Sequence, residues 1–109
     1  MFWDNELQAN AIQTFLNSTG HFGSQALFEQ GHATELFFRL YKRRRSYSHG
    51  ERILLEIALD FWNGQGNARF ADLYQLNAHD RSLVFSLYQA LCSSSQAVQA
   101  WIEAHSPLG

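Results

Sequence analysis

Apolar residues recur every three or four positions along most of the 109-residue chain, which is the spacing of one face of an α-helix. The clearest stretch follows Ser48-His49-Gly50-Glu51, which fits a capping box, in which the serine and glutamate side chains satisfy early backbone amides of a helix. The expected helix covers residues 49–62. Only Glu56 and Asp60 remain clearly polar among its apolar positions, so we expect it to be central and buried on most sides.

The other apolar stripes predict further helices, separated by breaks that contain glycine, serine or asparagine. We expect a helix that starts near Thr34 and runs into residues 42–45, and others over 5–17, 24–29, 70–76, 78–92 and 96–104. The only proline is Pro107, whereas a β-rich fold of this size needs more turn residues. The prediction is an all-α fold, with five or six helices packed around helix 49–62 in one compact domain over residues 1–109.

Composition excludes several classes of protein. Hydrophobic residues make up 46% of the chain and charged residues 17%, which argues against intrinsic disorder. The single cysteine, Cys92, excludes a disulfide framework, and its place at the end of an apolar helix predicts a buried or half-buried thiol. No apolar run reaches the ~20 residues that span a bilayer, and no signal peptide is visible. We therefore expect a soluble, cytoplasmic protein with no membrane partner.

The net charge of −2 conceals a basic run, in which five of the eight lysines and arginines fall within seven positions: Arg39, Lys42, Arg43, Arg44 and Arg45. Arginine offers a planar fork to phosphates and carboxylates, and Tyr41 and Tyr47 flank the run and could stack on bases. A structural explanation competes with a functional one, since cations in the last turn of a helix favour its dipole. Under the structural explanation, the basic run is only the solvated end of a helix and binds no partner.

The chain also has more aromatic residues than a core this small needs. Phe38 is the best candidate for an exposed anchor, because it falls off the apolar stripe of its helix and lies beside Arg39. Phe2 and Trp3 could pack on the body of the protein or on a second subunit, so a homodimer stays open. The candidate partner-binding residues are Arg39, Lys42, Arg43, Arg44, Arg45, Phe38 and Tyr47.

No catalytic or metal-binding constellation is visible. The histidines His21, His32, His49, His79 and His105 show none of the spacings of metal ligands. Glu56 and Asp60, four residues apart, are typical of a solvated stripe, although they could meet Arg52 or a cation of a partner. We expect no catalytic residue, no metal and no cofactor, and predict that the protein is not an enzyme.

Residues 48–91 resemble a family of small uncharacterised bacterial proteins that are frequent on plasmids, prophages and integrative elements. The resemblance is carried by Leu-Leu-Glu-Ile-Ala-Leu-Asp-Phe-Trp-Asn at 54–63, a glycine-bearing loop, and Phe70-x-Asp72-Leu73-Tyr74-x-Leu76. Tyr74 stands where the family tends to have a tryptophan. The resemblance implies no activity, and it implies the genomic context of a mobile element.

These observations favour a non-catalytic protein-binding module or inhibitor, such as an anti-defence protein of a phage or another mobile element. The alternative is a nucleic-acid-binding accessory protein that uses the basic segment 39–47. Against the alternative, a whole-domain nucleic-acid binder is usually net basic, which this chain is not.

Overall fold

Side-chain caps determine where four of the helices begin. Ser48 precedes α3 (His49–Asn63), where its hydroxyl accepts the Glu51 N–H and the Glu51 carboxylate accepts the Ser48 N–H, so the predicted capping box is confirmed. Thr34 and Asn77 cap α2 (Glu35–Lys42) and α5 (Ala78–Ser93) in the same way, each accepting an N–H three residues later. Gly64 ends α3 with φ 76°, the left-handed conformation that favours glycine.

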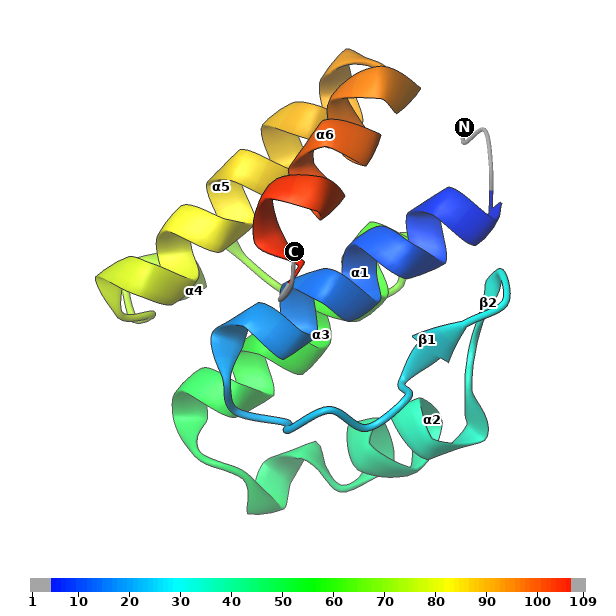
Figure 1. The fold of residues 1–109 in the computed structure, drawn as a ribbon. Coiled ribbons are helices and arrows are strands. Elements are labelled where there is room, and N and C mark those ends of the chain that lie inside the picture. Colours follow the sequence, from blue (N-terminus) through cyan, green and yellow to red (C-terminus); the bar gives the residue numbers. More distant parts are fainter. Residues whose placement is uncertain (1–4, 107–109) are drawn as a thin grey trace.

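The computed structural model describes residues 5–106, which contain six α-helices, one 3-10 turn and one small hairpin (Figure 1). The remaining elements are α1 (Asn5–Thr19), β1 (Phe28–Glu29), β2 (His32–Ala33), the 3-10 turn η1 (Arg44–Ser46), α4 (Phe70–Leu73) and α6 (Ser95–His105). The predicted all-α class is confirmed. A radius of gyration of 12.8 Å is that of one domain of this length.

The core lies between α1, α3, α5 and α6. Six residues of α3 are buried, and Phe61 on the same helix packs edge-on against Phe15 of α1, with 5.8 Å between ring centroids. α1 is as central as α3, because it contacts α3, α5, α6 and both strands. In Figure 1, α5 and α6 lie side by side as a pair over α1, while α2 and the hairpin lie on its other side.

The prediction of a helix over residues 24–29 is wrong, because this segment leads into a hairpin and its last two residues form the strand β1. Phe28 pairs with Ala33 and Glu29 with His32, around a two-residue turn in which Gln30 (φ 51°) and Gly31 (φ 84°) are both left-handed. This is the turn that matches the twist of antiparallel strands.

A long-range contact selects the hairpin over the expected helix. The side-chain oxygen of Gln13 on α1 accepts the backbone N–H groups of Leu27 and Phe28, both at 2.8 Å. Those amides are thereby held by another helix. Phe28 is fully buried beside Phe37 of α2, with 4.6 Å between ring centroids.

The predicted break before the last helix is confined to Ser94. Its extended backbone separates α5 from α6, and its hydroxyl accepts the Ala97 N–H at 3.0 Å. Near the end of α5, Cys92 is exposed, so the expectation of a buried or half-buried thiol is wrong. The buried face of α5 passes through Leu87, and five residues further on the helix has turned about 140° from it.

Phe2, Trp3 and Pro107 lie outside the described residues. The expected packing of Phe2 and Trp3, on the body of the protein or on a second subunit, therefore also lies outside them. Among the helices of residues 5–106, none has the length and apolar character needed to span a membrane.

Candidate binding surfaces

The predicted basic run does not form a single surface. Arg39, Lys42 and Arg43 are exposed on α2 and directly after it. Arg39 lies 3.6 Å from the carboxylate of Glu35, one turn earlier on the same helix. Arg45 is also exposed, but it lines a separate cleft that it shares with α3 and α4. Four of the five predicted cations are therefore accessible, in two different places.

Arg44 is the exception, because it is part of the folded structure. Its Nε donates to Glu56 at 2.6 Å, a second guanidinium N–H donates to the Tyr41 carbonyl at 2.8 Å, and the group lies 4.0 Å from the centre of the Tyr41 ring. Glu56 also accepts the Tyr41 hydroxyl at 2.5 Å and the Asn67 N–H at 3.0 Å. Glu56 is thus the centre of a network, and its ion-pair partner is Arg44 and not Arg52, the alternative that the sequence left open.

These contacts shift the pKa values of the groups concerned. Burial alone would raise the pKa of Glu56, but its three hydrogen-bond donors outweigh burial and hold that pKa below its usual range. Burial and the hydrogen bond to Glu56 raise the pKa of Tyr41 to about 12. Burial also raises the pKa of Asp60, although two backbone N–H groups donate to it. Neither carboxylate belongs to the solvated stripe that the sequence predicted.

A loop covers the side of α3 that carries Glu56 and Asp60, and its close approach to the helix depends on Gly66. Residues 64–69 fold back over the helix, and Gly66 and Ala68 direct their N–H groups to the Asp60 carboxylate. A Cβ atom on Gly66 would overlap the carbonyl oxygen of Glu56 and lie 2.9 Å from the Asp60 nitrogen. Only glycine allows this approach of the loop to the helix backbone.

The aromatic residues of the predicted site differ in exposure. Phe38 is 40% exposed, as expected, with its ring edge-on to Phe37. Tyr47 is half-buried against the core, and the Tyr41 ring is covered by the Arg44 guanidinium. The two tyrosines that flank the basic run therefore do not form a free stacking platform for bases.

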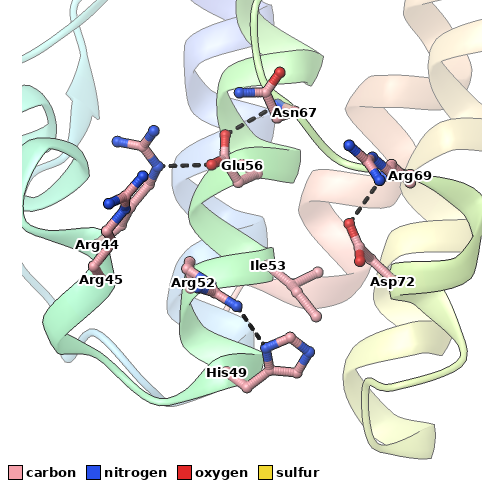
Figure 2. Close-up of a pocket in the computed structure, with 9 residues that line it drawn as sticks. All are labelled: Arg44, Arg45, His49, Arg52, Ile53, Glu56, Asn67, Arg69 and Asp72. Carbon is pink, nitrogen blue, oxygen red and sulfur yellow. Dashed lines mark hydrogen bonds and ion pairs between the residues drawn. The ribbon is translucent and has the colours of Figure 1, made fainter.

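A cationic cleft of about 400 Å³ crosses the surface of α3 (Figure 2). Arg44 and Arg45 stand on one side of the helix, and Arg69 and Asp72 on the other. Four arginine side chains line it with only two carboxylates, and the full set is Arg44, Arg45, His49, Arg52, Ile53, Glu56, Asn67, Arg69 and Asp72.

An aromatic groove of about 500 Å³ lies between α4 and α5, lined by Phe70, Leu73, Tyr74, Phe85 and Tyr88. Its four aromatic side chains are between 52% and 86% exposed. Phe70 and Tyr88 belong to the apolar stripes that predicted the helices over 70–76 and 78–92, but neither side chain is buried. α5 buries the face that carries Leu83, Val84 and Leu87, which leaves Phe85 and Tyr88 on its outer side.

The cationic cleft and the aromatic groove each share lining residues with a third hollow. This hollow, of about 430 Å³, is lined by Phe61, Arg69, Phe70 and Leu73 among others. Arg69 also lines the cationic cleft, and Phe70 and Leu73 also line the aromatic groove. A single extended ligand could therefore contact arginines at one end and aromatic rings at the other.

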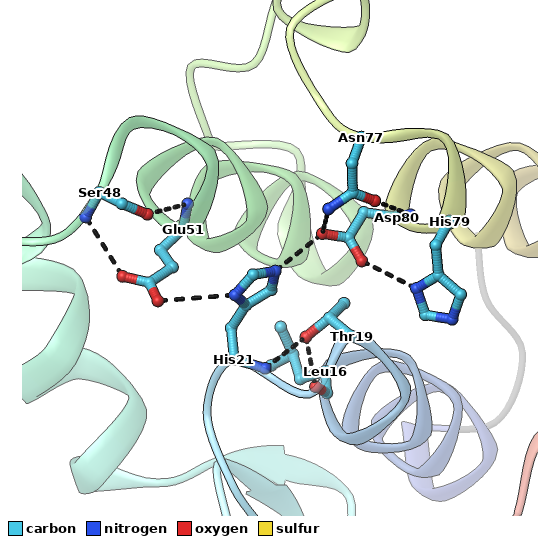
Figure 3. A network of polar contacts seen from close by, with 8 residues as sticks. All are labelled: Leu16, Thr19, His21, Ser48, Glu51, Asn77, His79 and Asp80. Atoms are coloured by element: carbon cyan, nitrogen blue, oxygen red, sulfur yellow. Dashed lines mark hydrogen bonds and ion pairs between the residues drawn. The ribbon is translucent and has the colours of Figure 1, made fainter.

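A polar network that the sequence did not predict joins three distant segments (Figure 3). His21, in the loop after α1, points one ring nitrogen at Asp80 (2.8 Å) and the other toward Glu51 (3.5 Å). Asp80 is 98% buried and also accepts from Asn77, while the His79 ring lies 3.2 Å from its second oxygen. Both ring nitrogens of His21 thus face carboxylates, one on α3 and one on α5. The network ties the starts of α3 and α5 to the end of α1.

No family model, curated protein or solved structure matches the chain. Within residues 5–106, no three side chains of His, Cys, Asp or Glu are grouped so that they could hold a metal ion.

Proposed function

We propose that the protein is a non-catalytic binding module for another protein, which it engages through the aromatic groove between α4 and α5. The observation that carries this proposal is the exposure of Phe70, Tyr74, Phe85 and Tyr88 around one hollow. With ~200 Å² for each aromatic side chain, their exposed fractions amount to roughly 500 Å² of ring surface. The largest apolar patch on a monomeric protein is commonly of this size and is often functional, and tyrosine is enriched among the residues that dominate binding energy.

The partner segment that fits this surface is apolar with acidic residues at one end. Its apolar side chains would fill the groove, and its carboxylates would lie near Arg69, which lines both the third hollow and the cationic cleft. A second copy of the chain fits less well, because a two-fold contact of this surface with itself brings two cationic clefts into one interface. Charge complementarity therefore favours a different protein.

The proposal includes a setting for this interaction. The resemblance of residues 48–91 supports an origin in a phage or another mobile element, where a small module of this kind would inhibit a host protein. The exposed thiol of Cys92, the only cysteine of the chain, supports a location in the reducing cytoplasm.

The test combines capture with variants. The tagged chain is used to purify its partner from the native host, and the purified pair is then measured by calorimetry. We expect Phe70→Ala with Tyr88→Ala to weaken binding at least ~30-fold, since each lost anchor costs about 1–2 kcal/mol. Phe38→Ala is the matched control, because it removes an exposed ring from α2.

Three outcomes would overturn the assignment of the groove. In the first, Phe38→Ala abolishes binding and the groove variants do not, which moves the interface to α2. In the second, the groove variants bind with the affinity of the wild type. In the third, sedimentation shows a wild-type dimer that the groove variants dissociate, so a second copy occupies the groove.

Nucleic-acid binding through residues 39–47 is the second candidate, and the exposure of Arg39, Lys42 and Arg43 favours it. A salt titration with duplex and single-stranded probes tests it, since phosphate contacts give an affinity that falls steeply with salt concentration. No binding at low salt would eliminate this candidate.

A further inference from the structure

The cationic cleft holds more positive charge than the protein itself neutralises. Of its four arginines, only Arg44 forms an ion pair with a carboxylate among the described residues. The guanidinium groups of Arg45, Arg52 and Arg69 have no carboxylate within 4.0 Å in that part of the chain. Three arginines of one cleft of about 400 Å³ thus form no ion pair within the described residues, and the four arginines outnumber the two carboxylates that line it.

The two acidic side chains of the cleft already have other partners. Glu56 accepts hydrogen bonds from Arg44, Tyr41 and the Asn67 amide. Asp72 accepts the backbone N–H of Arg69 at 3.0 Å, which caps the short helix α4. Neither carboxylate lies within ion-pair distance of the guanidinium groups of Arg45, Arg52 and Arg69.

Arg52 is held in place within the cleft. One of its guanidinium N–H groups donates to Nδ1 of His49 at 2.8 Å, and the other ring nitrogen of His49 contacts the side-chain oxygen of Gln75 (Figure 2 shows the Arg52 contact). Because a guanidinium group only donates, Nδ1 is the acceptor of this hydrogen bond. A positioned guanidinium loses less rotational freedom when it binds an anion.

We propose that this cleft is a binding site for an oxyanion of the phosphate class, held by Arg45, Arg52 and Arg69. A phosphate group carries close to two negative charges at neutral pH and three acceptor oxygens, so it matches several guanidinium forks at once. The volume of the cleft lies within the range of small-molecule sites. This site goes beyond the proposed protein-binding function, and either can fail without the other.

The shape and surroundings of the cleft favour a small phosphate group over a nucleic-acid backbone. Its cations come from three segments, η1, α3 and the residue before α4, and line one hollow (Figure 2). The chain is net negative, which opposes a long polyanion, and the rings of Tyr41 and Tyr47 are not free for stacking.

The experiment is a titration of the isotope-labelled protein with pyrophosphate at constant ionic strength, followed by NMR of backbone amides and arginine Nε–H groups. We expect saturable shifts at the arginines of the cleft. Arg52→Gln and Arg69→Gln should each weaken binding about tenfold, the loss of one charge-assisted contact. The matched control is Arg43→Gln, which makes the same charge change outside the cleft and should alter the affinity less than about twofold.

A second variant tests the site by a gain of affinity. Asp72→Asn removes a negative charge from the cleft while keeping a side-chain oxygen for the Arg69 N–H. We expect pyrophosphate to bind this variant about two- to fivefold more tightly, because a like charge is removed. A variant that simply failed to fold could not show such a gain.

Several results would overturn the proposal: shifts that do not saturate, an equal loss of affinity in Arg43→Gln, or no gain in Asp72→Asn. A short duplex that binds more tightly than pyrophosphate and loses its affinity in Arg43→Gln would also overturn it, in favour of a nucleic-acid surface. Two further ligands identify the source of the phosphate, and both results support the site. Tighter binding of a phosphoserine peptide than of pyrophosphate assigns it to a protein, and the reverse assigns it to a small molecule.

Discussion

Replacing Glu56 by glutamine tests whether the network around Arg44 stabilises the fold. The Glu56 side chain is 12% exposed and that of Arg44 25%, so their ion pair lies between an exposed pair, which contributes up to ~1 kcal/mol, and a buried one, whose disruption costs ~3–5 kcal/mol. Glutamine keeps one of the two acceptor oxygens and loses the charge. We expect the free energy of unfolding to fall by about 2 kcal/mol, the value of one hydrogen bond to a charged group.

For a chain of this length, that loss lowers the melting temperature by about 9 °C. The assay is urea denaturation together with calorimetric melting of the wild type, Glu56→Gln and Tyr41→Phe. The double variant should lose less stability than the two single variants together, with a coupling of at least ~0.5 kcal/mol, because Glu56→Gln removes the charged acceptor and Tyr41→Phe the donor of the same hydrogen bond. Glu35→Gln is the control, since that carboxylate is exposed and pairs with Arg39 at 3.6 Å.

The reasoning also predicts a pH dependence. The pKa of Glu56 is lower in the folded chain than its ordinary value of 4.5. A lowered acidic pKa contributes stability that is complete above the ordinary value and is lost as the pH falls through the folded value. The difference between the wild type and Glu56→Gln should therefore shrink below pH 4.5. A Glu56→Gln variant as stable as Glu35→Gln, or strictly additive losses in the double variant, would refute a stabilising network.

Three other predictions follow from the same region. Arg44→Ala should lower the free energy of unfolding by about 2 kcal/mol, whereas Arg43→Ala should change it by less than ~0.5 kcal/mol, as measured by urea denaturation; equal effects would contradict the different placement of the two arginines. Gly66→Ala should destabilise the protein by about 2–3 kcal/mol, because its Cβ would overlap the backbone of α3, and a melting temperature equal to that of the wild type would contradict this close approach. The raised pKa of Tyr41 predicts stability that is present below its ordinary pKa of 10.0 and is lost as the pH rises toward about 12; alkaline unfolding should show this loss in the wild type and not in Tyr41→Phe.

The sequence predicted the helices well because their signals are local. The capping box at Ser48 and Glu51 acts within a few residues, and the structure confirms it. The hairpin at residues 28–33 depends instead on Gln13, which is 14 residues or more from the amides it accepts. A local sequence pattern cannot indicate a contact over that separation.

Periodicity also indicates which residues share a face, but not whether another element covers it. Tyr88 shares a stripe with Leu87, yet only the latter is buried. The exposed rings of α4 and α5 were therefore missed as candidate binding residues. The basic run was correctly identified as a group of cations, but the pairing of Arg44 with Glu56 joins residues 12 positions apart and divides that group.

Only Ser94 separates α5 from α6, so a change at this one residue could let two molecules exchange their α6 helices. If Ser94 became helical, the two helices would merge into one rod, and α6 would leave its place against α1 of its own chain. It could then occupy the equivalent place in a second chain, which is a domain swap. Ser94→Ala removes the cap and favours the helical state, so sedimentation of concentrated Ser94→Ala protein should reveal an exchanged dimer that the wild type does not form.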